Sequence, residues 1–357
     1  MTELETLLAH PPFSLGKAQK AEVFSAILSK LTAHHYQHCA AYKKILDSLR
    51  VDPALKQPAE HTPFLPVRMF KDFELKSIEP AAIQKTMTSS GTTGQNVSKI
   101  FLDKATATHQ TKVLSKIVSD LIGPKRLPML IIDSREAVKS RNVFSARGAG
   151  ILGFSMFGRD VTYSLDANMQ LDLPTVEAFA EKYAGNPVFI FGFTSIIYQH
   201  FIKSLQNMQK PLALDSAILL HGGGWKKLAD IAVNNEVYKK MLADVAGISS
   251  VHNYYGMVEQ TGSIFTECSA GHLHSSIFSD IIVRRTDLSP ANFGEQGLVQ
   301  LVSLLPKSYP GHSILTEDMG TLIGEDDCNC GRLGRYFHIH GRAQQAEVRG
   351  CSDTYAA

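Results

Sequence analysis

The chain has little excess charge of either sign, and this balance excludes several kinds of partner. Lys and Arg together number 36 and Asp and Glu 34 among 357 residues. A surplus of two is too small for the positive field that draws nucleic acids or anionic membranes. No apolar run is long enough to cross a bilayer, and the N-terminus is acidic where a signal peptide is basic. We therefore expect a cytoplasmic protein with no membrane span and no nucleic-acid partner.

Cysteine is also scarce, and its spacing argues against a disulfide framework. The chain has five cysteines, an odd number, and only one residue separates Cys328 from Cys330. This pattern favours metal ligation plus a free thiol. Internal repeats and low-complexity tracts are absent, and the 44% hydrophobic content is enough for one or two cores. The composition predicts a folded globular protein.

The order of apolar patterns predicts an α/β fold. Apolar residues at steps of three and four predict helix from Lys17 to Leu49, and prolines between positions 53 and 66 then indicate a connector. Short apolar runs typical of buried strands follow at Leu127–Ile132, Val188–Phe193, Ala217–Leu220, Leu298–Leu305 and Tyr336–His340. Between several of them lie helical stretches at Thr108–Leu121, Ile196–Leu205 and Val237–Val245. Strands alternating with helices indicate a sheet flanked by helices.

The strongest local motif is a loop rich in hydroxyls and glycine, Thr88–Gly94, with the sequence TSSGTTG. Glycine lets the backbone wrap closely, and hydroxyl groups can donate to phosphate oxygens. The Gly-Lys-Ser/Thr ending of a Walker loop is missing. A Ser/Thr-rich surface turn is the alternative for such a loop alone, so the other motifs decide between the two readings.

This loop resembles the phosphate loop of the adenylate-forming superfamily, and further motifs of that superfamily follow in order. The segments are His221–Trp225 (HGGGW), Tyr254–Glu259 (YYGMVE), Ile314–Asp318 (ILTED) and Ile339–Arg342 (IHGR). The resemblance implies that Glu259 serves a magnesium ion and that Asp318 holds the ribose. It further implies ATP contacts from Ser89, Ser90, Gly91, Thr92, Thr93, Gly94, Gly222, Gly223, Tyr255 and Arg335.

A closer resemblance, to the LuxE acyl-protein synthetase family, covers nearly the whole chain. It rests on Val67–Lys71 (VRMFK) and on residues 341–352 (GRAQQAEVRGCS). It implies an adenylate-forming large domain (67–340) with no small C-terminal domain, preceded by the N-terminal segment (1–66) that periodicity predicts to be helical and followed by a tail (341–357). Cys351 stands where that family carries its acyl-accepting cysteine. A fatty acid would be activated with ATP, moved to this thiol and passed to a fatty-acyl reductase partner.

The expected absence of the small domain also removes the lysine with which relatives stabilise the reacting phosphorus. Another cation must then serve, because charge that develops on phosphate needs preorganised positive groups. Lys71, Lys99, Arg335 and Arg342 are the basic candidates. We expect Lys99 and Arg342 to act in catalysis.

A second constellation predicts structural zinc. Cys268 and Cys328 with Cys330 come from two short segments, and three thiols plus one imidazole make a tetrahedral site. Similar segments in phenylacetate-CoA ligase-like relatives favour His274 as the fourth ligand, whereas a Cys-x3-His spacing would use His272. Four protein ligands leave no open position, so we expect no catalytic role for the metal.

Two rival functions stay open at this stage. One keeps the fold and loads an aryl or short acyl group onto coenzyme A or a carrier protein, which would make Cys351 dispensable. The other is a non-catalytic subunit of an acyl-transfer complex. The histidines at positions 34, 35 and 38 are expected to be packed or solvated because no carboxylate or thiol of matching geometry accompanies them.

Overall fold

The structure is a computed structural model that describes residues 3–89, 97–138 and 146–343. The chain divides into two compact units. Unit 1 runs through Asp120 and resumes at Tyr255, and unit 2 is Leu121–Tyr254 within the described residues. We describe each unit by itself.

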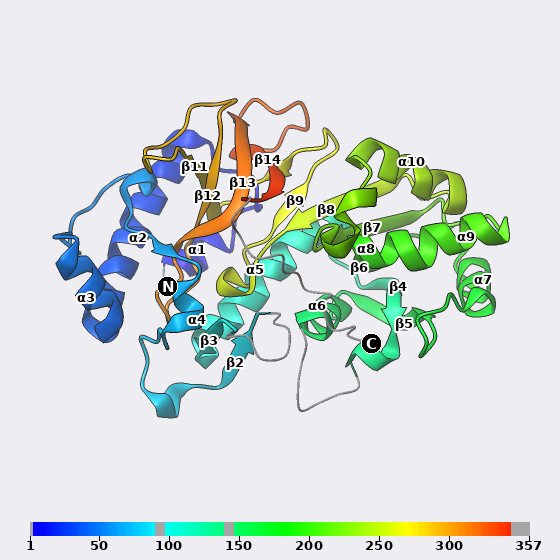
Figure 1. Ribbon diagram of the computed structural model, residues 1–357, viewed down its shortest axis with the longest axis horizontal. Helices are drawn as coiled ribbons and strands as arrows, with labels where there is room; N and C mark the ends of the chain where they lie inside the picture. Colours follow the sequence, from blue (N-terminus) through cyan, green and yellow to red (C-terminus); the bar gives the residue numbers. More distant parts are fainter. Residues whose placement is uncertain (1–2, 90–96, 139–145, 344–357) are drawn as a thin grey trace. The chain divides into compact units, whose positions relative to one another are not determined.

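Unit 1 combines an N-terminal group of helices with a mostly antiparallel sheet (Figure 1). Its helices are α1 (Glu3–Leu7), α2 (Lys17–His38), α3 (Ala40–Ser48), α4 (Met69–Asp72) and α5 (Lys104–Ile122). The sheet has the order β11-β12-β13-β14-β10-β9, with β1 (Leu65–Pro66) parallel to β13. Its strands are β9 (Phe265–Glu267), β10 (Leu273–His274), β11 (Ser279–Arg284), β12 (Gln296–Ser303), β13 (Ser313–Glu325) and β14 (Arg335–Arg342).

Helix α2 is joined to this sheet by buried polar contacts. Lys20 Nζ lies 3.3 Å from Asp280 Oδ1 of β11, and Thr32 Oγ1 lies 3.0 Å from His312 Nε2 just before β13. The sheet itself packs around Phe265 and Phe337, which are fully buried. Helix α2 is therefore fixed to the sheet by contacts between residues that are far apart in the sequence.

The predicted opening helix is divided in two at Cys39. That residue adopts an extended backbone conformation (φ −125°, ψ 101°), so α2 ends and α3 starts in a new direction. The Cys39 side chain is buried in the cluster that also contains Tyr42 and Leu46. Burial of this side chain with the two α3 residues compensates the break in the helix.

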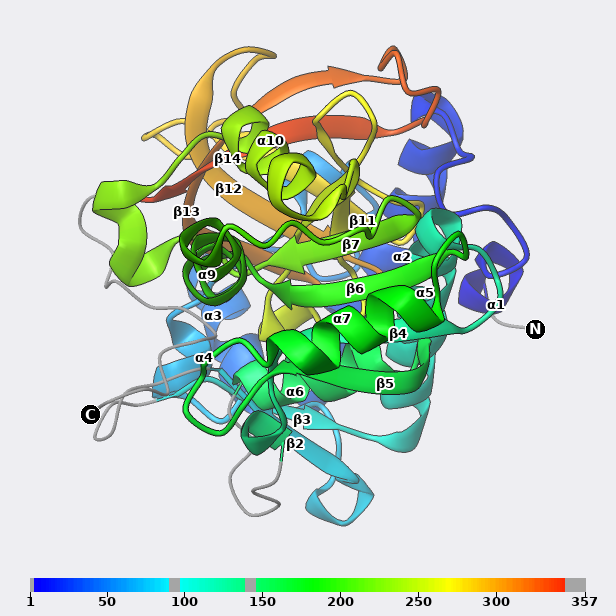
Figure 2. The same ribbon diagram turned by 90° about the vertical axis from the view of Figure 1, so that its right-hand side faces the viewer.

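Unit 2 is a parallel sheet with helices between its strands, as the alternating pattern predicts. Its strand order is β8-β7-β6-β4-β5, and Figure 2 shows β7, β6, β4 and β5 side by side with α7 in front. The strands are β4 (Leu127–Ser134), β5 (Gly158–Leu165), β6 (Val188–Phe193), β7 (Ala217–Gly222) and β8 (Ser250–Tyr255). The helices are α6 (Ala146–Ser155), α7 (Leu173–Lys182), α8 (Thr194–Ile196), α9 (Lys203–Met208) and α10 (Asn235–Ala246).

The helical stretch predicted at Ile196–Leu205 contains a π-helical turn, Ile197–Ile202, between α8 and α9. Ile197, Tyr198, Phe201 and Ile202 are all buried. Wider turns of this kind are rare, and burial of these side chains is consistent with local packing overriding regular helix geometry. The α/β class is confirmed, because helices alternate with the strands of the parallel sheet in unit 2.

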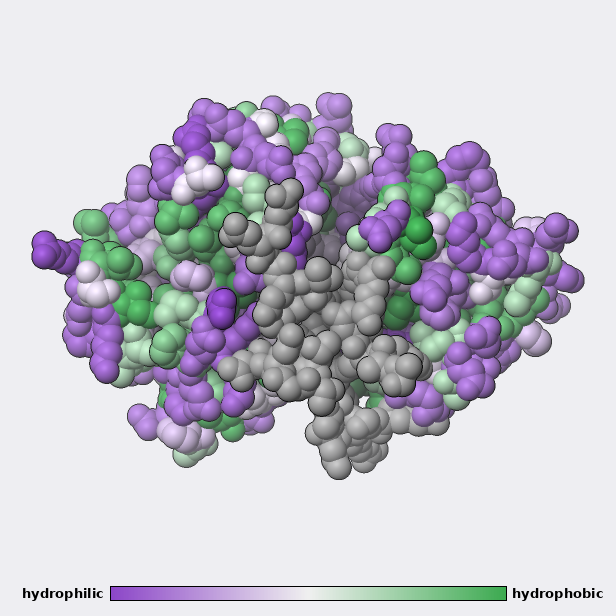
Figure 3. All heavy atoms as spheres, viewed as in Figure 1, coloured by the Kyte–Doolittle hydropathy of each residue, from purple (hydrophilic) through white to green (hydrophobic). Residues whose placement is uncertain are grey.

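The face shown in Figure 3 is mainly hydrophilic, with several hydrophobic areas. Exposed apolar side chains include Leu49 and Leu55 around the end of α3. In the described part of the chain, no helix is both long and apolar enough to cross a membrane.

Candidate functional site

The predicted phosphate loop joins two short antiparallel strands of unit 1, β2 (Lys85–Thr88) and β3 (Lys99–Leu102). Thr88 pairs with Lys99, and the ladder continues through Ser89, whose backbone N–H donates to Ser98 O at 3.1 Å. The Ser89 hydroxyl oxygen accepts from Ser98 N at 3.0 Å. The expected ligands Ser90, Gly91, Thr92, Thr93 and Gly94 lie outside the described residues. The structure thus describes only the paired strands at the base of the predicted loop.

The predicted ribose ligand, Asp318, lies on β13 beside two other predicted site residues. The Tyr255 hydroxyl at the end of β8 donates to Asp318 Oδ2 at 2.6 Å. Arg342 is the register partner of Asp318 on β14, and its Nε lies 4.0 Å from Asp318 Oδ1. Arg342 also lies 3.5 Å from Glu317 Oε2. Residues that were assigned from three separate motifs are therefore one contact group in unit 1.

Electrostatics around Asp318 reflect opposing effects. Burial raises the pKa of its carboxyl group, while the Tyr255 hydrogen bond and the charge of Arg342 lower it. The pKa of Tyr255 is raised well above its usual value by burial and by the neighbouring carboxylate. Tyr255 is therefore a neutral hydrogen-bond donor at physiological pH.

Glu259, the predicted magnesium ligand, lies in a short 3-10 turn (Val258–Gln260) and is buried. Its backbone carbonyl accepts a 2.8 Å hydrogen bond from the Tyr309 hydroxyl. Burial raises the pKa of its carboxyl group, and the Ser98 hydroxyl and the charges of Lys71 and Arg342 oppose that rise. In its ionised form this carboxyl group offers the ligand type that Mg²⁺ prefers, carboxylate oxygen.

The basic candidates separate in the structure. Lys99 is half-exposed and lies 3.8 Å from Glu74 Oε1. The Arg335 guanidinium is ion-paired with Glu60 and lies 3.3 Å from Glu325 Oε1, at the opposite end of β14 from Arg342. Burial lowers the pKa of the Arg335 guanidinium, but the carboxylates of Asp280, Glu60 and Glu325 together raise it above its usual value. The predicted ATP contact of Arg335 stays a prediction, but its guanidinium already has structural partners.

In unit 2, the glycine-rich segment His221–Trp225, which is predicted to contact ATP, begins with the last two residues of β7. A Cβ atom on Gly222 would lie 2.6 Å from a Tyr254 ring carbon and 2.8 Å from the Tyr254 carbonyl oxygen. Gly222 is therefore required by close packing, while Gly223 has a positive φ of 84° that glycine adopts readily. The Thr194 hydroxyl lies 2.9 Å from His221 Nδ1 and fixes the ring at the start of the turn. Sequence reasoning did not select Thr194, because no local signal joins it to His221.

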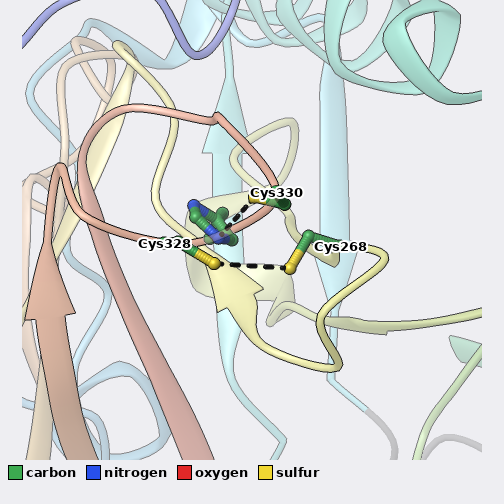
Figure 4. Close-up of side chains that lie close together, drawn as sticks. Cys268, Cys328 and Cys330 are labelled. Carbon is green, nitrogen blue, oxygen red and sulfur yellow. Dashed lines mark hydrogen bonds between the residues drawn. The ribbon is translucent and has the colours of Figure 1, made fainter.

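The predicted zinc ligands come together in unit 1. One ligand atom from each of Cys268, His274, Cys328 and Cys330 lies within 4.8 Å of the other three. The Sγ atoms of Cys268 and Cys328 are 3.9 Å apart, and Cys330 Sγ is 3.4 Å from His274 Nε2. Figure 4 shows the three cysteine side chains pointing toward one another. Two segments 60 residues apart in sequence thus form one cluster.

Tight turns place these sulfur atoms. Gly271 N donates to Cys268 O at 3.0 Å, and Gly331 N donates to Cys328 O at 3.0 Å. Both glycines have positive φ, 80° and 79°. The backbone N–H of Arg332 points to Cys330 Sγ at 3.4 Å. An N–H directed at a thiolate stabilises the negative charge of the sulfur. In the sequence, this turn is indicated by the glycine that follows Cys330.

The donor set fits zinc in chemistry and spacing. Tetrahedral zinc with Zn–S of about 2.3 Å and Zn–N of about 2.0 Å places two sulfur ligands about 3.8 Å apart and sulfur and nitrogen about 3.5 Å apart. Burial and nearby positive groups lower the pKa of His274 to about 3, so its ring is neutral and able to ligate. The alternative ligand, His272, places its Nδ1 3.5 Å from Cys328 Sγ but is not in the four-residue group.

The acyl-accepting candidate, Cys351, lies outside the described residues. Cys39 does not belong to the cluster and is buried.

Comparison with solved structures supports the fold. A crystal structure of an open conformation of 2-hydroxyisobutyryl-CoA ligase, in complex with 2-HIB-AMP and CoA, has a TM-score of 0.68 and 13% identity, covering 93% of this chain and 76% of that chain. The same ligase in the postadenylation state with 2-HIB-AMP has a TM-score of 0.69 and 13% identity, covering 92% and 69%. In the thioesterification state with 2-HIB-AMP and CoA the TM-score is 0.68 at 15% identity, covering 93% and 70%. At these identities the likeness shows the fold alone.

A match to a family of known sequences goes further. No curated protein sequence matches this chain. The family described as "Acyl-protein synthetase, LuxE" matches residues 2–357. This range contains the hydroxyl-rich loop, the Asp318 group, the cysteine cluster and Cys351. The family and the ligases that share this fold together support ATP-dependent activation of a carboxylic acid. The chain therefore belongs to the LuxE acyl-protein synthetase family.

Proposed function

We propose that this protein activates a fatty acid as an acyl-adenylate and transfers the acyl group to its own Cys351. The observation that carries the proposal is the family match, because it extends over residues 2–357 and so includes the cysteine. The grouping of Asp318, Tyr255 and Arg342 in unit 1 supports the nucleotide part of the proposal.

In the first step a carboxylate oxygen of the acid would attack the α-phosphorus of ATP, and pyrophosphate would leave. Asp318 would accept hydrogen bonds from the ribose hydroxyls, and the loop Ser89–Gly94 would donate to phosphate oxygens. Glu259 would hold Mg²⁺, which supplies charge neutralisation at the phosphates. Lys99 and Arg342 are our proposed cations for the developing negative charge. The ATP contacts predicted for Gly222 and Gly223, which belong to unit 2, stay a prediction.

In the second step the Cys351 thiolate would attack the acyl carbonyl carbon. The bond between this carbon and the phosphate oxygen would break, AMP would leave, and a thioester would form. Cys351 is nine residues beyond Arg342, the last residue of β14. Nine residues span about 30 Å at full extension. A segment of this length that starts at Arg342, beside Asp318, is long enough for its thiol to reach an acyl-adenylate bound at the Asp318 group. A fatty-acyl reductase or another acyl-acceptor protein would then receive the acyl group.

Coenzyme A is the alternative acceptor, and one observation favours it. The solved ligase with the same fold was crystallised with 2-HIB-AMP and CoA, so this fold does support transfer to a small thiol. Cys351 would be dispensable under this alternative.

Acid-dependent ATP–pyrophosphate exchange tests the first step. We expect exchange with a fatty acid in the absence of coenzyme A, measured over a panel of chain lengths and aryl acids. Adding coenzyme A should leave the exchange rate unchanged, and no acyl-CoA should form. Exchange absent with every acid would make the protein a non-catalytic subunit, and stoichiometric acyl-CoA formation would identify the coenzyme A ligase.

We further propose that Cys268, His274, Cys328 and Cys330 hold a structural zinc ion. The support is the sulfur and nitrogen donor set, the mutual spacing of the four atoms and the neutral His274 ring. The metal would crosslink the turn after β9 to the loop before β14 and supply folding free energy.

A further inference from the structure

Two side chains of unit 1 that are far apart in sequence form a short hydrogen bond at the proposed ribose site. Tyr255 ends β8, and Asp318 lies 63 residues later on β13. The Tyr255 hydroxyl donates to Asp318 Oδ2 at 2.6 Å. A bond of this length to a carboxylate is charge-assisted and directional. It fixes one of the two carboxylate oxygens.

The rest of the carboxylate is also restrained. The backbone N–H of Asp318 donates to Thr316 Oγ1 at 3.1 Å, which sets the local backbone. On the other side, Arg342 Nε lies 4.0 Å from Oδ1. A carboxylate has about four acceptor positions, so one hydrogen bond from Tyr255 leaves acceptor capacity on both oxygens for a vicinal diol.

The hydroxyl that orients Asp318 is itself held by the core. The Tyr255 ring lies 6.2 Å from Phe265 and 6.5 Å from Phe337, centroid to centroid, and the second pair meets edge to face at 82°. Both phenylalanines are fully buried. Because the ring is anchored by packing, the hydroxyl presents a fixed donor to the carboxylate.

We propose that Tyr255 is a positioning residue for ribose recognition. Its hydroxyl orients Asp318 so that the carboxylate accepts hydrogen bonds from the 2′- and 3′-hydroxyls of ATP, a role separate from any contact of the ring with the base. This inference rests on the proposed function, because it takes Asp318 as the ribose ligand. The proposed positioning role belongs to the Tyr255 hydroxyl group and not to its aromatic ring.

A ligand-by-residue cycle tests the role. Tyr255→Phe keeps the ring and removes the hydroxyl, so we expect the KM for ATP in pyrophosphate exchange to rise three- to tenfold while kcat changes less than twofold. Wild type should prefer ATP over 2′-deoxy- and 3′-deoxy-ATP by at least about tenfold, since each analogue lacks one hydrogen bond to a charged carboxylate. In Tyr255→Phe this preference should fall toward one, because a misoriented carboxylate no longer distinguishes the sugars.

Tyr36→Phe is the matched control. It removes a 2.7 Å tyrosine-to-aspartate hydrogen bond to Asp47 between α2 and α3. This variant should keep the KM for ATP and the sugar preference of the wild type. If Tyr255→Phe also keeps both, the positioning role is wrong although the proposed function stands.

The pH profile gives a readout that a purely structural role would not move. The Tyr255 bond lowers the pKa of Asp318 against the effect of burial. Without the hydroxyl, the acid limb of kcat/KM for ATP should shift to higher pH. If the wild type shows no exchange with any acid, the proposed function fails, and calorimetric titration of the same proteins with ATP and its deoxy analogues decides the role. Equal sugar preference in that titration would overturn it.

Discussion

Thr92 and Thr93 supply two of the hydroxyl donors of the predicted phosphate loop. We expect Thr92→Val and Thr93→Val each to raise the KM for ATP or lower kcat, because a buried hydrogen bond to a charged group contributes about 1.5–3 kcal/mol. Pyrophosphate exchange kinetics measure the effect. Thr86→Val, an exposed residue of β2, is the control and should change neither constant. Unchanged kinetics in both loop variants would contradict the assignment of the loop.

Two buried histidines predict how stability depends on pH. The rings of His35 and His312 stack with centroids 4.9 Å apart, and both side chains are buried. Burial lowers the pKa of His312 to about 3 and that of His35 well below its usual value. The unfolded chain binds these protons near pH 6.5 while the folded chain does not, so stability falls as the pH drops from about 6.5 toward 3.

For His312 alone, this loss amounts to about 2 kcal/mol at pH 5. Urea unfolding at pH 7 and pH 5 should show it, and His312→Gln should make the difference between the two pH values smaller by about that amount. His10→Gln, at an exposed position, should leave the difference as in wild type. An equal pH dependence in His312→Gln and wild type would contradict the account.

The sequence motifs selected candidate residues, but they did not indicate which side chains those residues contact. The motif around Asp318 predicted that residue, and the motif around Glu259 predicted Tyr255, but neither motif indicated the hydrogen bond between Tyr255 and Asp318. The same holds for Arg335, whose partners Glu60 and Glu325 come from distant segments. Local patterns report which chemistry a residue offers. Which groups meet depends on strand pairing across long separations, and no local pattern specifies it.

At the scale of elements, periodicity located most helices and strands. Strand β6 has the predicted bounds Val188–Phe193, because a continuous run of buried apolar residues leaves few alternatives. The break at Cys39 and the π-helical turn Ile197–Ile202 were not predicted. At both sites the spacing of apolar residues predicts an uninterrupted α-helix. The two irregularities therefore arise from tertiary packing and not from local propensity.

Helix α2 has a cap that comes from the other end of unit 1. The backbone N–H of Lys17, its first residue, donates to Asp326 Oδ2 at 2.7 Å, and Asp326 Oδ1 accepts from Gly334 N at 2.7 Å. We expect Asp326→Ala to lower the free energy of unfolding by about 1–2 kcal/mol, as the loss of a helix cap does. Chemical denaturation measures it. Asp287→Ala, which removes only a local turn contact to Ser289, should cost less. Equal effects would contradict the capping role.

The cysteine cluster predicts one zinc ion per chain. Metal analysis of protein purified without a metal-binding tag should find it, and Cys328→Ser should lose the metal and lower the melting temperature, because structural zinc contributes folding free energy. Cys39→Ser removes a cysteine outside the cluster and should keep the metal. Wild-type protein that is metal-free, folded and active would rule out the site.

At the scale of the whole molecule, the predicted nucleotide residues are distributed over both units. Asp318, Glu259 and Arg342 belong to unit 1, and Gly222 with Gly223 to unit 2. Unit 1 consists of two separate stretches of sequence. The boundaries predicted at residues 66 and 340 divide the chain into consecutive segments, and such a division cannot describe a discontinuous unit. Composition and periodicity describe neighbouring residues in the sequence. Unit 1 is formed by contacts between two segments that are far apart in the sequence, and these patterns do not report such contacts.

Transfer of the acyl group to Cys351 is the central claim, and intact-protein mass spectrometry tests it most directly. After incubation with ATP, Mg²⁺ and a fatty acid, wild type and Cys39→Ser should gain one acyl group, the mass of the acid minus water, and neutral hydroxylamine should remove it as it removes a thioester. Cys351→Ser should keep pyrophosphate exchange and gain no acyl group. An adduct that persists in Cys351→Ser, or wild type that gains none while it consumes coenzyme A, would contradict the account.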